Sequence, residues 1–542
     1  MQHSSSKADY SAGPLFDDDQ MTSSSYEPPS SALLITNHMN LMYMIAAGLI
    51  MPPDGFAGKY YRDTLNAFPG WIPLFVDRAF EEAINISISE ADYLKPCLAE
   101  VSLEGLSGEV AVIRGDGFEK LQFPEEIRAG EKVILVPAPL PVSWIRIIHF
   151  QSEDEKKACE SEARDFGNVL LSSFTLKALK TKTPFSKSKI IKESWPPLLD
   201  LEKRSVSLEM PLSAGGVMAM LFHFANKGML GVETCRLAFD PEDESKSMIK
   251  EPILSGIVPW ILTGSVQEAE DSLDIDHSAN LQDEAHSRVF WEAVNNLVNR
   301  RINSSVTNNS EKVLLDMLET AISRETDPRL KRGFTKLRNT LESLTGLGEH
   351  TVTELFKLHT SSLSHAMTLC FLRKTCAELR DFTNPLLSER DWLAAAILFG
   401  AREGWLPLPL NLRDFPGLTE SVSHRMAQLS HQIDGTGIDL GAAPSRTRPL
   451  RELFGDGSNW GKRENSAALL LAQRKRWNCV QTRITFAVGT YELKVERGKV
   501  EIALKGEPTI QTEVDATRFF DFLEDDSLSA KVEKKIREEL NI

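Results

Sequence analysis

A group of polar residues between two apolar segments is the first place in this chain where chemistry could occur. Thr36, Asn37 and His38 follow a strand-like apolar run, and Asn40 precedes a helical pattern that continues to Leu49. Hydroxyl, amide and imidazole groups gathered where a strand ends and a helix begins commonly hold a ligand. Thr36, His38 and Asn40 are therefore candidate ligand-binding residues.

An isolated arginine, Arg62, lies between that helical pattern and a second apolar run, Trp71–Phe75. Its rigid fork of donors suits phosphate groups. Structural alternatives stay open for each of these residues. Arg62 fits an exposed loop, Asn40 fits a helix N-cap, and His38 fits a histidine that only stabilises the fold.

Strand-like and helix-like patterns alternate from residue 32 to residue 150, which predicts an α+β domain. Helices are expected at Leu41–Leu49 and Ala79–Ile86. The expected strands are Leu33–Ile35, Ile72–Phe75, Ala99–Leu103, Val110–Ile113 and Val133–Val136.

The rest of the chain is mainly helical in pattern, with a small β element at its C-terminal end. We expect a disordered arm at 1–31, because it is rich in Ser, Asp and Pro. The predicted regions after residue 150 are a mixed helical region with a basic segment (151–264), an acidic linker (265–287), a helical domain (288–445) and a helix plus β-hairpin module (446–542). Gly215 and Gly216 lie near the start of an apolar helical pattern in the first of these regions.

The composition is that of a soluble globular protein. The formal charge of −16 argues against a protein that coats nucleic acid non-specifically, although local basic patches can still exist in an acidic chain. The six cysteines form no CxxC pair and are expected to be reduced. No apolar run reaches the roughly 18 residues of a membrane span, and the N-terminal segment lacks the apolar core of a signal peptide. The expected location is the cytoplasm, without a membrane partner.

Three segments resemble the DarT-like branch of the ADP-ribosyltransferase fold. The first is ITNHMNL, followed by a helix and GLI, and the second is PGWIPLF after Arg62. The third is KVILVPAPLPVSWI, which resembles the late strand and turn of that family. They extend over roughly residues 32–150, about a fifth of the chain.

This resemblance implies an ADP-ribosyltransferase-like domain with NAD as cofactor. Arg62 would hold the diphosphate, and Thr36, His38 and Asn40 would form the nicotinamide end. The family's glutamate aligns with Val133, while Glu131 lies two residues earlier, on the same strand face. Glu131 is therefore the candidate catalytic carboxylate.

Lysines are concentrated between residues 177 and 192, where six lysines occur with no acidic residue. The segment includes Phe185 and ends near Trp195, an arrangement compatible with phosphates and a stacked base; a solvated linker is the alternative. The predicted nucleic-acid-binding residues are Lys180, Lys182, Lys187 and Lys189. A second basic group extends from Arg329 to Arg338. No metal-ligand spacing is present, so no metal is expected.

The sequence thus supports three functions. The first is a non-catalytic component of a bacterial anti-phage defence system, which binds partner subunits or DNA, because the DarT-like family belongs to such systems. The second is an active NAD-dependent ADP-ribosyltransferase that modifies DNA. The third is a helical scaffold with no ligand.

Overall fold

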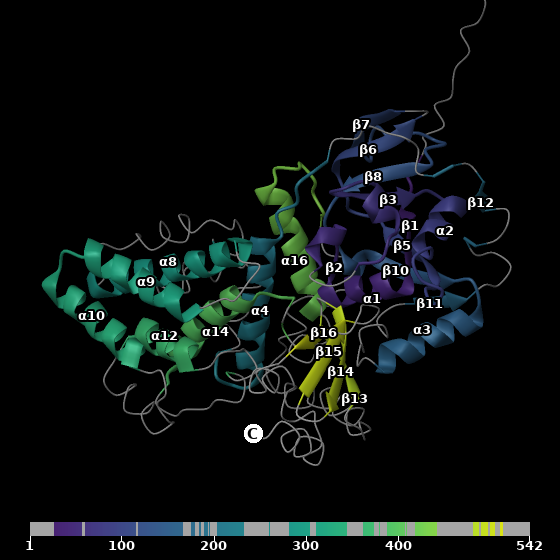
Figure 1. Ribbon diagram of the computed structural model, residues 1–542. Coiled ribbons are helices and arrows are strands. Elements are labelled where there is room, and N and C mark those ends of the chain that lie inside the picture. Colours follow the sequence, from purple (N-terminus) through teal and green to yellow (C-terminus); the bar gives the residue numbers. More distant parts are fainter. Residues whose placement is uncertain are drawn as a thin grey trace, which may run out of the picture.

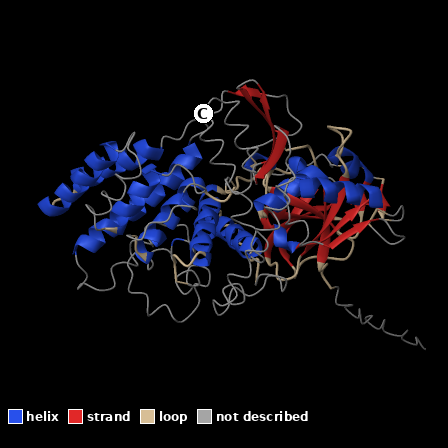
Figure 2. Ribbon diagram, turned by 90° about the horizontal axis from the view of Figure 1, so that it is seen from below, coloured by secondary structure: helices blue, strands red, loops and turns tan. Residues whose placement is uncertain are grey.

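The computed structural model describes most of the chain from residue 27 to residue 441 and parts of the C-terminal region. The described residues are 27–56, 60–114, 117–165, 175–178, 184–185, 189–192, 194–195, 203–231, 260, 281–303, 310–343, 361–372, 379, 387–406, 408, 418–441, 481–486, 489–496, 499–504 and 510–512. Figure 1 shows a sheet lobe formed by the N-terminal strands and a helical body beside it. Figure 2 shows the same division between strands and helices from below.

The sheet lobe is built on an eight-stranded mixed sheet with the order β11-β10-β5-β1-β3-β8-β6-β7. All its strand pairs are antiparallel except β10 with β11. Its strands are β1 (Ser31–Asn37), β3 (Trp71–Phe75), β5 (Pro96–Ser102), β6 (Gly108–Arg114), β7 (Gly117–Phe123), β8 (Val133–Pro137), β10 (Ile145–Phe150) and β11 (Thr175–Ala178). Two short pairs accompany it: β2 (Leu49–Ile50) with β9 (Leu140–Pro141), and β4 (Ala79–Phe80) with β12 (Ile190–Ile191).

Both faces of the central strands are buried, so these strands are apolar at nearly every position. Along β1, Leu34 belongs to the larger hydrophobic core, whereas Leu33 and Ile35 belong to a smaller core on the opposite face. This alternation follows from the two-residue period of a strand. The five strands predicted from the sequence are all present and longer than predicted, and β5 ends one residue before its predicted end. The edge strand β7, which has several exposed positions, was not predicted, because its residues lack a clear apolar alternation.

Two helices and three short 3₁₀ turns complete the part of the lobe around β1. They are α1 (His38–Ala47), α2 (Glu81–Ser87), η1 (Pro53–Gly55), η2 (Thr64–Ala67) and η3 (Val142–Trp144). The helix α1 begins at His38, three residues before the predicted start, because Asn37 is its N-cap and accepts a hydrogen bond from the Asn40 backbone N–H at 3.0 Å. The charged helix α3 (Glu153–Asp165) follows β10.

The helical body combines segments from both sides of the acidic stretch 265–287. Its helices are α4 (Glu209–Asn226), α8 (Leu281–Asn303), α9 (Ser310–Arg324), α10 (Pro328–Ser343), α12 (Ser362–Leu372), α14 (Glu389–Glu403) and α16 (Leu418–Ile433). The helix α4 packs against α14, α16 and α8, so one core joins these segments. The helix α8 begins at Leu281, within the predicted linker.

Hydrogen bonds between buried groups connect the helical body to the sheet lobe. The indole N–H of Trp405 donates to the Ala47 carbonyl at 2.6 Å, at the end of α1. The His431 Nε2 atom, on α16, lies 2.9 Å from the Pro139 carbonyl between β8 and β9. Since a carbonyl only accepts, Nε2 carries the proton, and burial lowers the pKa of His431 to about 4. The neutral imidazole therefore joins α16 to the sheet lobe.

A four-stranded antiparallel sheet forms the described part of the C-terminal region. Its strands, in sheet order, are β13 (Gln481–Phe486), β14 (Gly489–Glu496), β15 (Lys499–Leu504) and β16 (Ile510–Thr512). All four lie within the predicted helix plus β-hairpin module (446–542). Residues 446–480 and 513–542 of that module lie outside the described residues. A mixed N-terminal sheet, a helical body and a small C-terminal sheet together agree with the predicted fold class.

Candidate functional site

The polar residues at the end of β1 surround a carboxylate that the sequence did not single out, Asp63. Its Oδ2 atom accepts hydrogen bonds from the Thr36 hydroxyl at 2.6 Å and from the Tyr60 hydroxyl at 2.6 Å. The Asn40 amide donates to the same atom at 3.0 Å. The Leu65 backbone N–H donates to Oδ1 at 3.0 Å, because Asp63 is the N-cap of η2. We call these residues, Thr36, Asn40, Tyr60 and Asp63, the polar cluster.

Burial sets the protonation of this carboxyl group. Asp63 is 1% exposed, and removal from water raises its pKa from 3.8 to about 6, although the hydrogen bonds from Thr36, Tyr60 and Asn40 act in the opposite direction. Burial also raises the pKa of the Tyr60 hydroxyl well above 10, and the nearby Asp63 charge adds to that shift. Asp63 therefore changes its charge near neutral pH while Tyr60 remains a hydrogen-bond donor.

Asn40 has a structural role in this arrangement. Its Oδ1 atom accepts from the Tyr61 backbone N–H at 3.0 Å, and its Nδ2 atom donates to the Tyr61 carbonyl at 2.7 Å. With the bond to Asp63, the two polar atoms of the side chain hold the segment 60–63 against α1. Thr36 and Asn40 are fully buried, so neither offers a free polar group to a ligand in this conformation.

His38 and Arg62 lie at the margin of the polar cluster. The His38 Nδ1 atom accepts from the Lys95 backbone N–H at 3.1 Å, and its own backbone N–H donates to the Lys95 carbonyl at 2.9 Å. His38 is thereby tied to the start of β5 and is 3% exposed. The Arg62 residue is exposed, and its backbone N–H donates to Glu90 at 3.1 Å. Arg62 alone among the predicted cofactor-binding residues is open to solvent.

Glu131, the predicted catalytic carboxylate, lies at the other end of the sheet. In the strand register Leu33 pairs with Phe75, and Phe75 pairs with Val133. Val133 is therefore level with Leu33, about 13 Å along the strands from Asn37, at roughly 3.3 Å per residue. Glu131 precedes Val133 and so lies still farther from the polar cluster. The structure does not bring Glu131 together with Arg62 or Asn40.

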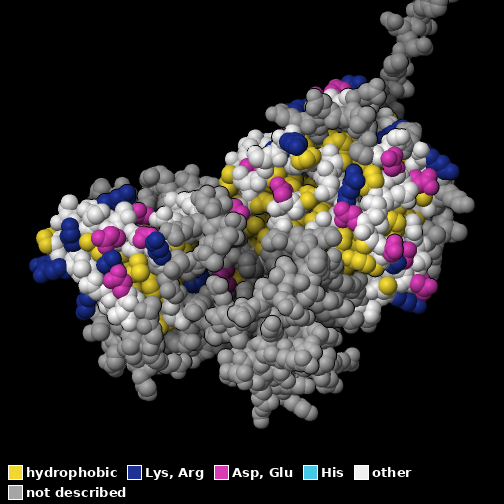
Figure 3. Space-filling model, in the orientation of Figure 1, with side chains coloured by type: hydrophobic (Ala, Val, Ile, Leu, Met, Phe, Trp, Pro, Cys, Tyr) yellow, Lys and Arg dark blue, Asp and Glu magenta, His cyan; other side chains and the backbone are white. Residues whose placement is uncertain are grey.

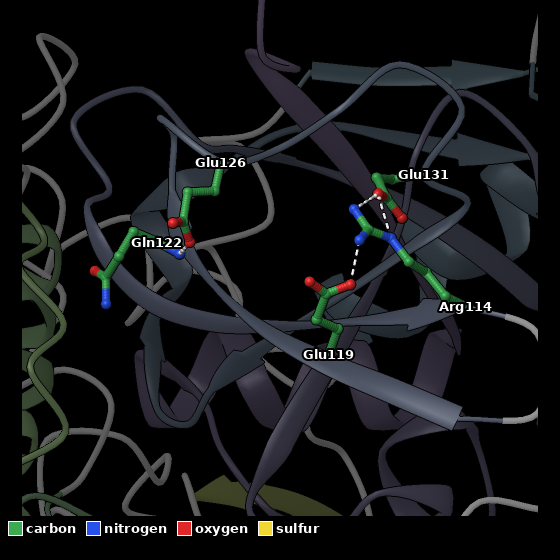
Figure 4. A network of polar contacts seen from close by, with 5 residues as sticks. All are labelled: Arg114, Glu119, Gln122, Glu126 and Glu131. Atoms are coloured by element: carbon green, nitrogen blue, oxygen red, sulfur yellow. Dashed lines mark hydrogen bonds and ion pairs between the residues drawn. The ribbon is translucent and has the colours of Figure 1, made fainter.

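An ion pair also occupies Glu131 (Figure 4). Its Oε1 atom accepts from Arg114 Nε at 2.9 Å and makes a second, shorter contact with another nitrogen of the same guanidinium. Arg114 also pairs with Glu119 on β7. The side chain of Glu131 is 7% exposed. These contacts make Glu131 part of a charged network that joins β6, β7 and the start of β8.

The aromatic residues near the predicted nucleic-acid-binding lysines are in the core. Phe185 is 6% exposed and Trp195 is 1% exposed, and both belong to the smaller core. The Trp195 ring packs against Phe75 at 4.8 Å between centroids. The idea that these rings stack on a base is therefore wrong. Lys189 is exposed, and its carbonyl accepts from the Ala79 N–H; Lys180, Lys182 and Lys187 lie outside the described residues.

Two features that the described residues lack bear on the class of site. No group of three or more His, Cys, Asp or Glu side chains there could hold a metal ion. In the same part of the chain, no helix is long and apolar enough to cross a membrane. The site that remains is a buried carboxyl group with its donors and one exposed arginine.

Comparisons with known proteins give no family assignment. No family model matches the sequence, and no curated protein matches it. Among solved structures, the chain is similar to Thermus sp. 2.9 DarT in complex with carba-NAD+, at 14% sequence identity and a TM-score of 0.21. The match covers 29% of this chain and 97% of that chain. A likeness of this extent carries no argument about activity.

Proposed function

We propose that this chain is a non-catalytic component of a bacterial anti-phage defence system. Its N-terminal domain would be ADP-ribosyltransferase-like, and the chain would bind nucleic acid or partner subunits. The order of the motifs in residues 33–75 and 133–145 supports the fold, and the defence setting comes from that resemblance. The resemblance covers only about a fifth of the chain, and the large helical body outside it favours a role in assembly.

The single observation that carries the non-catalytic assignment is the separation of Glu131 from Arg62. A transferase needs a carboxylate at the sugar and a cation at the diphosphate of one bound NAD molecule. Here Glu131, which precedes the first residue of β8, is paired with Arg114. Arg62 instead lies beside the polar cluster, near the end of β1. As placed, these residues do not fit one NAD molecule.

The hydrogen bonding of the polar cluster supports the same conclusion. Buried polar groups are stable only when they are paired, and the Asn40 and Thr36 side chains already have partners within the chain. A ligand amide would have to replace these bonds without gaining new ones. The cluster is therefore best explained as the support that holds residues 60–63 on the sheet lobe.

One observation favours the alternative, an active NAD-dependent ADP-ribosyltransferase. Asp63 directly follows Arg62, and its pKa of about 6 is in the range used by catalytic carboxyl groups. In that case Asp63, rather than Glu131, would be the functional carboxylate. Opening of the segment 60–63 would then have to precede catalysis.

An NAD-transfer assay distinguishes the two functions. The purified chain is incubated with NAD labelled in the ADP-ribose part and with single-stranded or duplex DNA, beside Arg62→Ala and Glu131→Ala variants. We expect no transfer of label to DNA or protein above the background of a heat-treated sample. Transfer that Arg62→Ala abolishes and Glu131→Ala preserves would replace the non-catalytic assignment with the Asp63 alternative.

A further inference from the structure

The outward face of α10 presents a set of cations at the end of the helical body. The inward face of the helix is fixed by Phe334, Leu337 and Leu341, which are buried in the core. The helical period therefore directs Lys331, Arg332 and Lys336 to the solvent, and all three are exposed. Figure 3 shows Lys and Arg side chains on this end of the molecule, with Asp and Glu side chains among them.

These three cations line a shallow hollow of about 470 Å³. The remaining lining residues are uncharged and polar: Thr335, Asn339, Thr340 and Ser343. Among the residues that the structure describes, no carboxylate and no aromatic ring lines the hollow. We call this surface the α10 hollow. Its residues extend from 331 to 343, which corresponds to about 18 Å along a helix.

The charges of the α10 hollow are not neutralised within the described residues. Lys331, Arg332 and Lys336 make no ion pair there, and the Arg332 Nε–H donates to the Pro328 carbonyl of the same helix at 3.1 Å. In contrast, Arg338 pairs with Glu319 at 2.8 Å and with Glu342 at 2.9 Å. Two nearby acidic side chains, Glu319 and Glu342, thus pair with Arg338 on the flank. In a chain with a formal charge of −16, three unpaired cations in one hollow are a marked local exception.

The uncharged side chains of the hollow indicate that charge would dominate binding. The hydroxyls of Thr335 and Thr340 donate to the carbonyls of Lys331 and Lys336, each at 2.8 Å. The Ser343 hydroxyl donates to the Thr340 carbonyl at 2.6 Å. These protons are used within the helix, so the ammonium and guanidinium groups are the main donors for a ligand. Such a surface attracts phosphate groups without reading bases.

We propose that the α10 hollow binds the phosphate backbone of a nucleic-acid duplex, independently of sequence. This inference deepens the proposed binding function and gives it a site on the helical body. Phosphates of one duplex strand follow each other at about 3.4 Å along the axis, so a surface about 18 Å long can contact several. A single strand is less suitable, because the described residues of the hollow include no aromatic ring for stacking. An acidic protein surface is less suitable too, because those same residues include no apolar anchor.

The salt dependence of duplex binding tests this site. The full chain is compared with the variant Lys331→Gln/Arg332→Gln/Lys336→Gln on a DNA duplex and on an RNA duplex. If the three cations neutralise three phosphates, the slope of log K against log salt concentration becomes shallower by about 2.7 in the variant. We also expect the affinity at low salt to fall at least about tenfold. If the variant binds either duplex more weakly than the wild-type chain does, the site is supported. The duplex that the wild-type chain binds more tightly is then the preferred ligand class.

A charge-matched variant controls for net charge. Arg78, Arg128 and Lys203 are exposed cations outside the hollow, and changing all three to Gln alters the net charge by the same amount. The control variant should keep the wild-type slope. An equal loss of duplex affinity in both variants would place duplex binding elsewhere on the chain. That result would overturn the proposal for the α10 hollow but leave the proposed binding function intact. A wild-type chain that binds neither duplex at low salt would overturn both the site and nucleic-acid binding.

Discussion

Replacing Gly400 by alanine is expected to lower the free energy of unfolding by about 3 kcal/mol or more, at the upper end of the overpacking range. Gly400 on α14 crosses Gly216 and Val217 on α4 with the two backbones in contact. A Cβ atom at Gly400 would overlap the backbone of Val217 and lie 2.7 Å from the Gly216 carbonyl carbon. Backbone atoms cannot move aside as a side chain can, so the helices would have to separate. Their packing forms the centre of the helical body.

Gly333 provides the matched control for this substitution. It lies in α10, is exposed, and an added Cβ there meets no atom within 4 Å. Gly333→Ala should therefore increase stability by roughly 0.5–1 kcal/mol, since alanine favours helix. Urea unfolding followed by circular dichroism measures both changes. Equal effects of the two substitutions would show that α4 and α14 do not cross at Gly400.

Replacing Asp63 by asparagine is expected to remove a pH dependence of folding stability. The folded-state pKa of Asp63 is raised from 3.8 to about 6 by burial, so the folded chain binds this proton more tightly than the unfolded chain. Stability is then highest below pH 3.8 and falls as the pH rises toward 6. This rise in the pKa corresponds to about 3 kcal/mol of folding stability, of which roughly half is lost between pH 5 and pH 8.

The asparagine variant also loses hydrogen bonding. Three donors, from Thr36, Tyr60 and Asn40, converge on one oxygen of Asp63, and an amide NH₂ group at that position cannot accept them. If the asparagine carbonyl still accepts from the Leu65 N–H, we expect the free energy of unfolding to fall by about 2–3 kcal/mol at pH 5. The loss should be smaller at pH 8, where the wild-type chain carries a buried charge.

Urea unfolding of both chains at pH 5 and pH 8 measures the effect of Asp63. The exposed Asp92 serves as control, because Asp92→Asn should leave the wild-type pH dependence unchanged. If Asp63→Asn and the wild-type chain lose the same stability between the two pH values, the carboxyl group does not titrate in this range.

The sequence predicted β1, β3, β5, β6 and β8 and several helices because these elements are encoded locally, but it did not predict β10. The apolar run before Thr36 defines β1, and the amide of Asn37 fixes the start of α1 by capping it. The sequence offered Asn40 as a possible N-cap, whereas the observed N-cap is Asn37, three residues earlier. Both amide side chains precede the same apolar pattern, so the pattern alone does not distinguish them. Asn40 instead holds the Tyr61 backbone, a partner that local patterns do not reveal.

The candidate site was only half predictable. Thr36, His38, Asn40 and Arg62 are near one another because they flank one strand and one helix. Asp63 was missed, since an acidic residue beside Arg62 in a loop resembles any surface acid until its burial is known. Likewise, Phe185 and Trp195 suggested a stacking surface beside lysines, whereas packing places both rings in the smaller core.

The sequence by itself determined where the chain changes from strand to helix, which segments are apolar, and that the protein is acidic with local basic groups. The tertiary structure decided which of the polar residues meet. In the sequence, Glu131 is two positions from the expected alignment. The register of β1, β3 and β8 nevertheless places it level with the start of β1, whereas Arg62 lies near the end of β1. The physical reason is that local pattern fixes the direction and faces of a strand, while the pairing of distant strands fixes how far apart their ends lie.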